Sequence, residues 1–241
     1  MGVFRFKKFE VVNERSAMKV NTDGVLLGAA MTVSPSDNTL LDIGTGTGTI
    51  ALMAAQRLFS CGICRTVQID AIDIDEASAE EAEANFSNSP WSEVLHAYHT
   101  SLDEFASDRK YDLIFSNPPY FEDSLNAPQE RRNNARHTST GLSYREILDF
   151  ASESLTDSGR VALVLPAETE QSLCRHARMN GLHLFRILRI RTVPRKAPSR
   201  IIAEFSRKRT DVPVDTVLTI QNEGKYTEEY LSLTGDFYLF A

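Results

Sequence analysis

The residues with the clearest chemical use are Asn117, Pro118, Pro119 and Tyr120, which follow the apolar, strand-like run 111–116. The asparagine side-chain oxygen and a backbone carbonyl of this turn can both accept hydrogen bonds from an –NH₂ group. The two prolines stiffen the turn, and Tyr120 offers an aromatic face to a planar ring. These four residues are therefore candidates to hold an aromatic amino group, and a rigid strand-to-loop turn without chemistry is the alternative interpretation.

A second feature lies upstream, where the strand-like run 39–43 leads into the loop 44–48 and then into the helix-like segment 49–58. A strand, a glycine loop and a helix begin a nucleotide-binding βαβ unit. The dinucleotide fingerprint would need a third glycine where Thr49 stands, so the spacing here is G-x-G-x-G. This spacing favours a nucleoside that carries no pyrophosphate, and a glycine-rich turn that binds no ligand is the alternative.

The next strand-like run, 67–73, ends with a carboxylate, Asp73. Its distance of roughly 25 residues from the glycine loop is what one strand–helix–strand unit needs to bring a carboxylate beside that loop. Such a carboxylate can accept hydrogen bonds from both hydroxyls of a ribose. Because Asp75 and Glu76 follow and favour the start of a helix over 77–86, helix capping is the alternative role for Asp73.

Strand-like and helix-like segments alternate along the chain. Apolar runs occupy 39–43, 67–73, 94–98, 111–116, 160–165, 183–190 and 200–206, and helical patterns occupy 49–59, 76–86, 143–155 and 168–179. This alternation predicts an α/β fold with a doubly wound, mostly parallel seven-stranded sheet and helices on both faces. Since the glycine loop and Asn117 both follow strands directly, we expect them at the same edge of the sheet.

The remaining segments suggest the domain organisation. Residues 1–35 begin like a hairpin and are predicted to form an N-terminal extension packed on a catalytic domain over 36–241. The polar stretch 121–140 is longer than most loops, which favours a functional lid or a disordered segment.

Composition narrows the class of protein. With 241 residues, 42% of them hydrophobic, the chain can bury a full core. Lys7, Lys8 and Glu10 interrupt the first stretch, and no run of about 18 apolar residues follows, so we expect neither secretion nor membrane insertion. The three cysteines are few and odd in number, as in a reducing compartment. These observations predict a cytoplasmic protein.

Metal binding has little support. Cys61 and Cys64 form one C-x-x-C pair, but neither Cys174 nor any histidine repeats its spacing. Zinc would need two further ligands. We therefore expect no metal.

Taken together, the motifs resemble the class I S-adenosylmethionine-dependent methyltransferases, within them the branch that methylates amino groups. The glycine loop is similar to the cofactor loop of that class, Asp73 to its ribose carboxylate, and residues 117–120 to its catalytic N-P-P-Y. The resemblance implies S-adenosyl-L-methionine as cofactor, S-adenosyl-L-homocysteine as product, and Asn117, Pro118, Pro119 and Tyr120 as catalytic residues. The cofactor-binding residues that it implies are Thr22, Asp23, Asp42, Gly44, Gly46, Gly48, Asp73, Ser101, Leu102 and Asn117.

Further motifs narrow this resemblance to one family within the class. Residues 18–29 are similar to the N-terminal signature of the bacterial tRNA-Val adenine methyltransferases, as are Ala135-Arg136-His137 and the segment 236–240. That family methylates the exocyclic 6-amino group of adenine 37, just 3′ of the anticodon. The resemblance implies that Thr22 and Asp23 lie near the methionine end of the cofactor.

One position departs from the family pattern. The family often carries an aspartate after the third strand that binds the cofactor adenine, and Ser101 stands there in this chain. A serine hydroxyl can still bond to an amino group, and Leu102 can offer its backbone N–H. Asp103 is expected to start the next helix instead.

RNA binding must be reconciled with a net charge of −7. The charge is uneven, because residues 186–209 hold nine basic side chains against Glu204 alone. Basic side chains can contact phosphates, and an ordinary solvated face is the alternative. The residues predicted to contact RNA are Arg131, Arg132, Arg136, His137, Arg195, Lys196 and Arg200.

Three interpretations of different kinds remain open. The first is an RNA adenine methyltransferase that acts on tRNA, as a monomer or a weak homodimer without a membrane or metal partner. The second is an amino-methyltransferase that acts on a protein glutamine or a DNA adenine, which the N-P-P-Y motif also serves. The third is a nucleotide-binding module or oxidoreductase without methyl transfer. The N-terminal signature favours the first.

Overall fold

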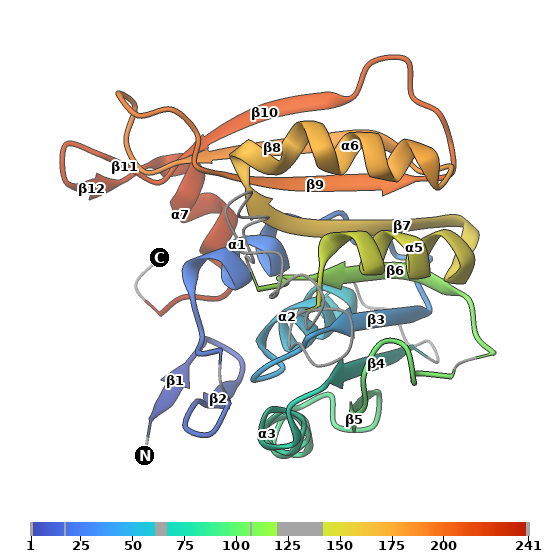
Figure 1. Ribbon diagram of the computed structural model, residues 1–241. Helices are drawn as coiled ribbons and strands as arrows, with labels where there is room; N and C mark the ends of the chain where they lie inside the picture. The colour runs from blue at the N-terminus through green and yellow to red at the C-terminus, as the bar shows by residue number, and fades with distance from the viewer. Residues whose placement is uncertain (1, 17, 61–66, 107, 120–141, 240–241) are drawn as a thin grey trace, which may run out of the picture.

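The computed structural model describes residues 2–16, 18–60, 67–106, 108–119 and 142–239. Outside these ranges lie the loop 121–140 and the predicted residues Cys61, Cys64, Tyr120, Arg131, Arg132, Arg136 and His137. Figure 1 shows one large sheet with helices on both of its faces. This architecture is the doubly wound α/β fold that the alternating pattern predicts.

The central sheet has the strand order β10-β8-β9-β7-β6-β3-β4-β5. Its strands are β3 (Thr39–Ile43), β4 (Gln68–Asp73), β5 (Leu95–His99), β6 (Tyr111–Ser116), β7 (Leu155–Pro166), β8 (His183–Arg191), β9 (Arg200–Ser206) and β10 (Val214–Thr219). Each of the seven predicted apolar runs forms a strand, but the predicted number of seven strands is wrong by one. The eighth, β10, lies at the edge with four of its six residues exposed, so it has no continuous apolar run.

Strand direction places the functional edge of the sheet. β9 runs antiparallel to β7 and β8, whereas the other pairs in this sheet are parallel. The strands β3 to β8 and β10 therefore all end at one edge, and only β9 begins there. Open α/β sheets bind their ligands at this edge.

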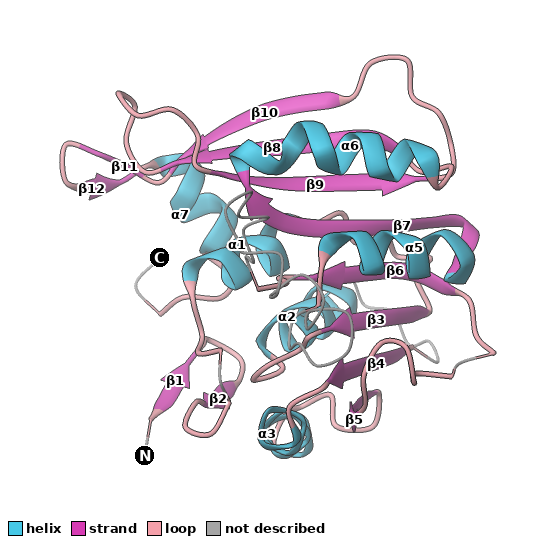
Figure 2. Cartoon of the chain, viewed as in Figure 1, coloured by secondary structure: helices cyan, strands magenta, loops and turns pink. Residues whose placement is uncertain are grey.

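Helices cover both faces of the sheet (Figure 2). They are α1 (Thr22–Ala30), α2 (Thr49–Ser60), α3 (Glu76–Ser87), α5 (Tyr144–Ser154), α6 (Glu170–Met179) and α7 (Glu228–Thr234). Consecutive residues of β3 show why two layers are needed. Leu40 packs into the core that includes α1 and α2, whereas Leu41 and Ile43 pack into the core that includes α5 and α6.

Short hairpins complete the fold. β1 (Val3–Arg5) and β2 (Glu10–Val12) pair antiparallel, which agrees with the hairpin-like start expected from the sequence. The backbone of Phe6 pairs with Tyr238, so segments near the two ends of the described chain lie side by side. A second hairpin, β11 (Gln221–Asn222) and β12 (Lys225–Tyr226), follows β10.

Gly48 packs too closely on its surroundings to accept a side chain. Its φ is +78°, and an added Cβ would lie 2.4 Å from a ring carbon of Phe86, which is fully buried. We expect Gly48→Ala to lower the free energy of unfolding by about 3 kcal/mol, from overpacking together with a left-handed backbone. Urea denaturation measures this loss. Gly181→Ala is the control, because Gly181 has φ +71° with nothing within 4 Å of an added Cβ. Equal losses in the two variants would contradict the packing argument.

Candidate active site

Hydrogen bonds fasten together the ends of three neighbouring strands. The Ser116 hydroxyl, at the end of β6, donates to the carbonyl of Ile43 at the end of β3 at 2.6 Å. The backbone N–H groups of Gly44 and Thr45 donate to the carbonyl of Ile72 in β4 at 2.9 and 3.0 Å. The glycine loop and Asn117 thus open at the same edge of the sheet, as expected from the sequence.

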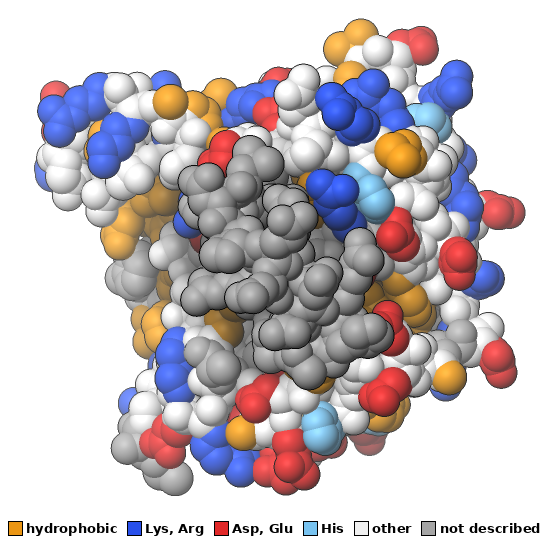
Figure 3. Space-filling view, in the orientation of Figure 1, with side chains coloured by type: hydrophobic (Ala, Val, Ile, Leu, Met, Phe, Trp, Pro, Cys, Tyr) orange, Lys and Arg blue, Asp and Glu red, His pale blue; other side chains and the backbone are white. Residues whose placement is uncertain are grey.

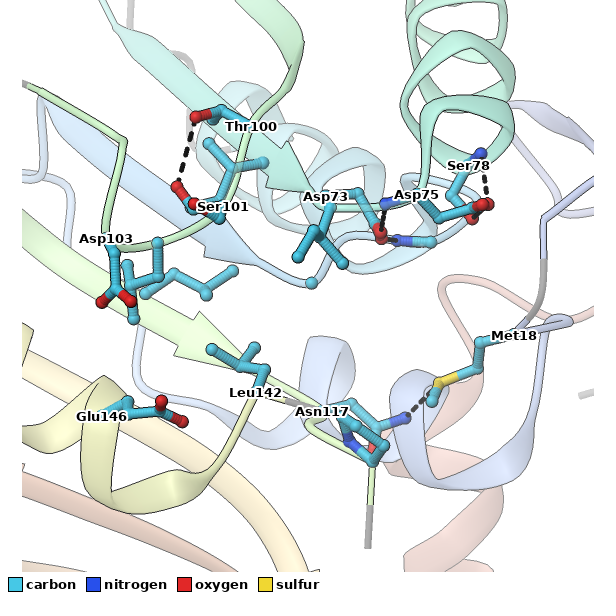
Figure 4. Close-up of a pocket in the computed structure, with 17 residues that line it drawn as sticks. Met18, Asp73, Asp75, Ser78, Thr100, Ser101, Asp103, Asn117, Leu142 and Glu146 are labelled. Atoms are coloured by element: carbon cyan, nitrogen blue, oxygen red, sulfur yellow. Dashed lines mark hydrogen bonds between the residues drawn. The ribbon is translucent and has the colours of Figure 1, made fainter. Parts of the chain in front are cut away.

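A cavity of about 680 Å³ lies at this edge, between the glycine loop and Asn117 (Figure 4). Its walls come from segments far apart in the chain. The lining residues are Met18, Ile43, Gly44, Gly46, Ile72, Asp73, Ile74, Asp75, Ser78, Thr100, Ser101, Leu102, Asp103, Asn117, Pro119, Leu142 and Glu146. Seven of the predicted site residues therefore meet around one space.

Asp73 closes the glycine loop against β4. Its carboxylate accepts hydrogen bonds from the backbone N–H groups of Gly46 at 2.8 Å and of Asp75 at 2.9 Å. Burial raises the pKa of Asp73 above its usual range, and these two bonds oppose that rise. The helix cap of α3 is Asp75, which accepts from the N–H of Ser78. Asp73 is thus not the N-cap, and its carboxylate borders the cavity.

The far wall of the cavity combines polar and apolar groups. The Ser101 hydroxyl donates to the Glu104 carboxylate at 3.2 Å and accepts from the Glu104 N–H at 3.3 Å, so it starts a turn. Leu102 and Asp103 line the cavity beside it. Ile74 also lines the cavity and is 65% exposed, an apolar surface suited to a planar base. This wall can hold a nucleobase.

Asn117 is nearly buried, with 6% of its surface exposed. Its Nδ2 atom lies 3.4 Å from the sulfur of Met18 and 3.5 Å from Oδ1 of Asn21. Pro118 is buried and Pro119 is partly exposed at the cavity. The sequence interpretation did not include Met18 and Asn21 among the site residues, although both belong to the recognised segment 18–29.

Two other residues of that segment lie away from the cavity lining. Thr22 and Asp23 begin α1, and neither lines the cavity. The Asp23 carboxylate forms an ion pair with Nε of Arg200 at 2.9 Å. This pair ties the start of α1 to the start of β9 at the functional edge. The predicted contact of both residues with the methionine end of a cofactor stays a prediction.

Two more members of the predicted cofactor set, Asp42 and Gly48, do not line the cavity. Asp42 is fully buried, and its Oδ2 accepts from the Thr45 hydroxyl at 2.8 Å. Among the described residues, none donates to its Oδ1. Gly48 packs on Phe86 rather than on the cavity. Asp42 therefore supports the glycine loop through Thr45, and Gly48 packs the end of the loop against Phe86.

The titration of Asp42 should be visible in stability. Burial raises the pKa of Asp42 to about 7, and the nearby Asp73 carboxylate adds to this rise. In the unfolded chain the carboxyl group of Asp42 titrates near pH 4. Between about pH 4 and pH 7, Asp42 therefore holds a proton in the folded state that it has lost in the unfolded state. We therefore expect Asp42 to reduce stability progressively as the pH rises through this window.

A comparison with Asp42→Asn isolates this effect. The free energy of unfolding of the wild type, minus that of the variant, should fall from about pH 4 to pH 7 and then level off. Chemical denaturation at several pH values measures the difference. Parallel pH profiles would contradict the assignment.

The basic stretch divides into distinct groups. Arg186 pairs with the buried Glu204, and Arg189 pairs with Glu170 and Asp215 nearer the surface. The groups available to a partner are therefore fewer than the sequence suggests.

The loop between β8 and β9 carries the exposed pair Arg195 and Lys196, whose side chains have no hydrogen-bonding or ionic partner among the described residues. This loop lies at the functional edge, because Ser199 bonds by its backbone to Ala167 at the end of β7 and to Ile190 in β8. Figure 3 shows basic side chains gathered at upper left, over this loop and the β11–β12 hairpin. Arg195 and Lys196 are thus placed to meet a polyanion.

Two negative findings concern the described residues alone. No group of three or more His, Cys, Asp or Glu side chains there could hold a metal ion. Within the same ranges, no helix has the length and apolar character that a membrane span requires.

Comparison with known proteins gives the family. A family model described as "Methyltransferase small domain" matches residues 15–176. A protein of Parabacteroides distasonis named tRNA1(Val) (adenine(37)-N6)-methyltransferase is 44% identical over 98% of this chain and 97% of its own length. A protein of Flavobacterium psychrophilum with the same name is 38% identical over 98% of this chain and 99% of its own length.

Solved structures agree on the fold. The crystal structure of a predicted O-methyltransferase from Agrobacterium tumefaciens superposes with a TM-score of 0.65 at 16% identity, covering 89% of this chain and 96% of that one. At this identity the likeness shows the fold alone, which is that of a methyltransferase. Because the family model and the close relatives both span most of the chain, the protein belongs to the methyltransferase small domain family and, within it, to the family of the tRNA1(Val) (adenine(37)-N6)-methyltransferases.

Proposed function

We propose that this enzyme transfers a methyl group from S-adenosyl-L-methionine to the exocyclic 6-amino group of adenine 37 in tRNA-Val. The observation that carries the proposal is a cavity that is lined by Asp73, the glycine loop and Asn117, in a chain 44% identical to a named relative. A donor and an acceptor bound in that cavity would meet at one edge of the sheet.

The residues present fit this cofactor. A cavity of about 680 Å³ is within the range of roughly 300–1,000 Å³ usual for ligand pockets. Asp73 can accept hydrogen bonds from the ribose hydroxyls, while Ile74 and Leu102 can pack on the adenine. When bound, the cofactor supplies an electrophilic methyl group on a positively charged sulfur. Ser101 and Asp103 both line the adenine end and are candidates to bond its amino group.

The acceptor side is built from Asn117 and Pro118. The lone pair of an aromatic amine is delocalised into its ring, which makes the nitrogen a poor nucleophile. Hydrogen bonds from its two N–H groups to the Asn117 side-chain oxygen and the Pro118 carbonyl would favour a pyramidal nitrogen with an available lone pair. Predicted stacking of the base on Tyr120 would contribute about 1–3 kcal/mol.

Positioning accounts for most of the catalysis in this proposal. Holding two reactants in line replaces an encounter in solution by a step within one complex. The proton on the nitrogen can leave after the methyl group has transferred, so no general base with a matched pKa is needed. The buried backbone around Asn117 and Pro118 supplies the rigidity that this alignment requires.

We also propose that Arg195 and Lys196 contact phosphates of the tRNA. Replacing both by glutamate should weaken tRNA binding about 10–100-fold and reduce the salt dependence of binding by roughly two counterions. Fluorescence anisotropy across a salt series measures both quantities.

The matched control is the pair Lys208 and Arg209. Both are exposed, and they follow the carboxyl end of β9, at the opposite edge of the sheet. Glutamate at both positions makes the same change of charge and should leave binding nearly unchanged. Equal losses for the two pairs would show that only net charge matters.

Substrate class separates this proposal from its alternatives. The protein is incubated with methyl-labelled cofactor and, separately, whole tRNA, genomic DNA and a protein extract. We expect label in tRNA, recovered after nucleoside digestion as N6-methyladenosine. Label in protein glutamine or DNA adenine would replace this proposal with the corresponding alternative.

The organisation of the chain belongs to the same proposal. Residues 1–35 are taken as an N-terminal extension on a catalytic domain over 36–241. The proposed substrate is found in the cytoplasm, where we expect the enzyme to act as a monomer or a weak homodimer.

A further inference from the structure

The role proposed for Asn117 requires a particular orientation of its side chain. The oxygen, not the –NH₂, must face the amino group of the substrate, because two donors would otherwise confront each other. The two ends of a planar amide are nearly equal in shape, so its hydrogen-bond partners decide which end faces which way. In the structure, a neighbouring side chain determines the orientation of the Asn117 amide.

That neighbour is Asn21, and the backbone sets its own orientation. Oδ1 of Asn21 accepts the backbone N–H of Gly24 at 2.9 Å, which caps α1. Its Nδ2 donates to the backbone carbonyl of Lys19 at 3.0 Å. A backbone N–H can only donate and a carbonyl can only accept, so the amide of Asn21 has a single satisfied orientation.

The orientation of Asn21 then determines that of Asn117. Oδ1 of Asn21 and the sulfur of Met18 are both acceptors, and both lie within 3.5 Å of the same nitrogen of Asn117. Two acceptors select the –NH₂ end of the Asn117 amide. In Figure 4 a dashed line joins the sulfur of Met18 to the side-chain nitrogen of Asn117. The Asn117 oxygen is therefore directed away from Asn21 and Met18.

We infer that Asn21 is a positioning residue that fixes the amide orientation of Asn117, so that the oxygen of Asn117 rather than its –NH₂ faces the amino group of the substrate. This inference rests on the proposed function for its consequence in catalysis. The geometry of the two amides does not depend on which amine is methylated.

A buried carboxylate holds residues 14–16, upstream of Asn21, in place, which supports such a role. Glu81, in α3, is 2% exposed and its carboxylate accepts the backbone N–H groups of Glu14, Arg15 and Ser16 at 2.7–3.1 Å. Three bonds to one buried carboxylate hold this segment against the helix.

Asn85, one turn further along α3, connects the N-terminal segment to the glycine loop. It exchanges two hydrogen bonds with the backbone of Val12, at 2.8 and 3.0 Å. The same side chain donates to the carbonyl of Thr47 at 2.9 Å. One face of α3 therefore supports both the N-terminal segment and the loop that borders the cofactor site.

Three substitutions at Asn21 separate positioning from helix capping. Asn21→Ser keeps a capping oxygen for Gly24, loses the donor to Lys19, and is one bond too short to reach Asn117. Asn21→Asp keeps both acceptor contacts, although it loses the donor to Lys19. Asn21→Ala loses the cap and the acceptor together.

The expected results follow from these differences. Asn21→Ser should keep the wild-type Tm and cofactor affinity but lower kcat about tenfold, as the loss of one hydrogen bond would. Asn21→Asp should retain a kcat within about threefold of the wild type, and Asn21→Ala should lose both kcat and Tm. Thr227→Ala removes the cap of α7, a helix that contributes no residue to the cavity lining, and should lower Tm with kcat unchanged.

A readout without turnover keeps this inference separate from the proposed function. The side-chain ¹H–¹⁵N amide signals of Asn117 are assigned by their disappearance in Asn117→Asp. They should shift in Asn21→Ser and much less in Asn21→Asp. Unshifted signals together with a wild-type kcat in Asn21→Ser would overturn the inference. Failure of the wild type to methylate tRNA would instead overturn the proposed function. The NMR result would still test whether Asn21 orients the amide of Asn117.

Discussion

Replacing Asn117 by alanine is expected to lower kcat for methyl transfer about 10²–10³-fold, the usual effect of deleting one preorganised hydrogen-bonding group at a reacting centre. The substitution removes the oxygen that would accept from the amine, and it leaves the strand bonds of Ser116 in place. Single-turnover assays with saturating cofactor and tRNA measure the chemical step without product release.

Two variants control this experiment. Asn117→Asp keeps an acceptor but places a carboxylate beside Oδ1 of Asn21, so we expect an intermediate loss. Asn88→Ala removes an amide from the C-terminal end of α3, which does not line the cavity, and should retain full activity. If Asn117→Ala kept kcat within threefold of the wild type, the proposed acceptor site would be wrong.

Replacing Asp73 by alanine should raise the Kd for S-adenosylmethionine by about two orders of magnitude or more. Hydrogen bonds to a charged group contribute about 1.5–3 kcal/mol each, and a ribose offers two hydroxyls. The variant also leaves the N–H of Gly46 without its carboxylate acceptor, so the loop loses its bond to the end of β4. Calorimetric titration with cofactor measures the loss.

Asp75→Ala is the matched control for that variant. It removes a neighbouring carboxylate that lines the same cavity but caps α3 instead of bonding the glycine loop. We expect reduced stability and a much smaller change in Kd. Similar losses of affinity in both variants would show that general negative charge, rather than a ribose contact, explains the role of Asp73.

The parts of the fold that could be predicted are those with both faces buried. β3 and β6 appear in the sequence as continuous apolar runs because each lies between two layers of helices. Helix α1 was not predicted, since seven of its nine residues are buried and it shows no polar face from which a helical period could be recognised. The edge strand β10 was not predicted for the opposite reason, because most of its residues are exposed and it has no apolar run.

The site shows a similar division. Residues directly after strands, such as Gly44, Asp73 and Asn117, could be placed at one edge because strand direction alone brings them together. The contact between Asn21 and Asn117 joins positions 96 residues apart, and no local pattern predicts it. No local pattern predicts the ion pair of Asp23 with Arg200 either. It joins a residue that the sequence assigns to cofactor binding to one that it assigns to RNA contact.

The central claim is that one cavity brings a methyl donor to the 6-amino group of adenine 37. Its most direct test uses two tRNA-Val transcripts that differ only by adenine or guanine at position 37, each incubated with enzyme and cofactor. Mass spectrometry of digested RNA should find N6-methyladenosine in the first, located at position 37, and no methylation in the second. Equal methylation of both transcripts, or of neither while the enzyme binds the cofactor, would contradict the account.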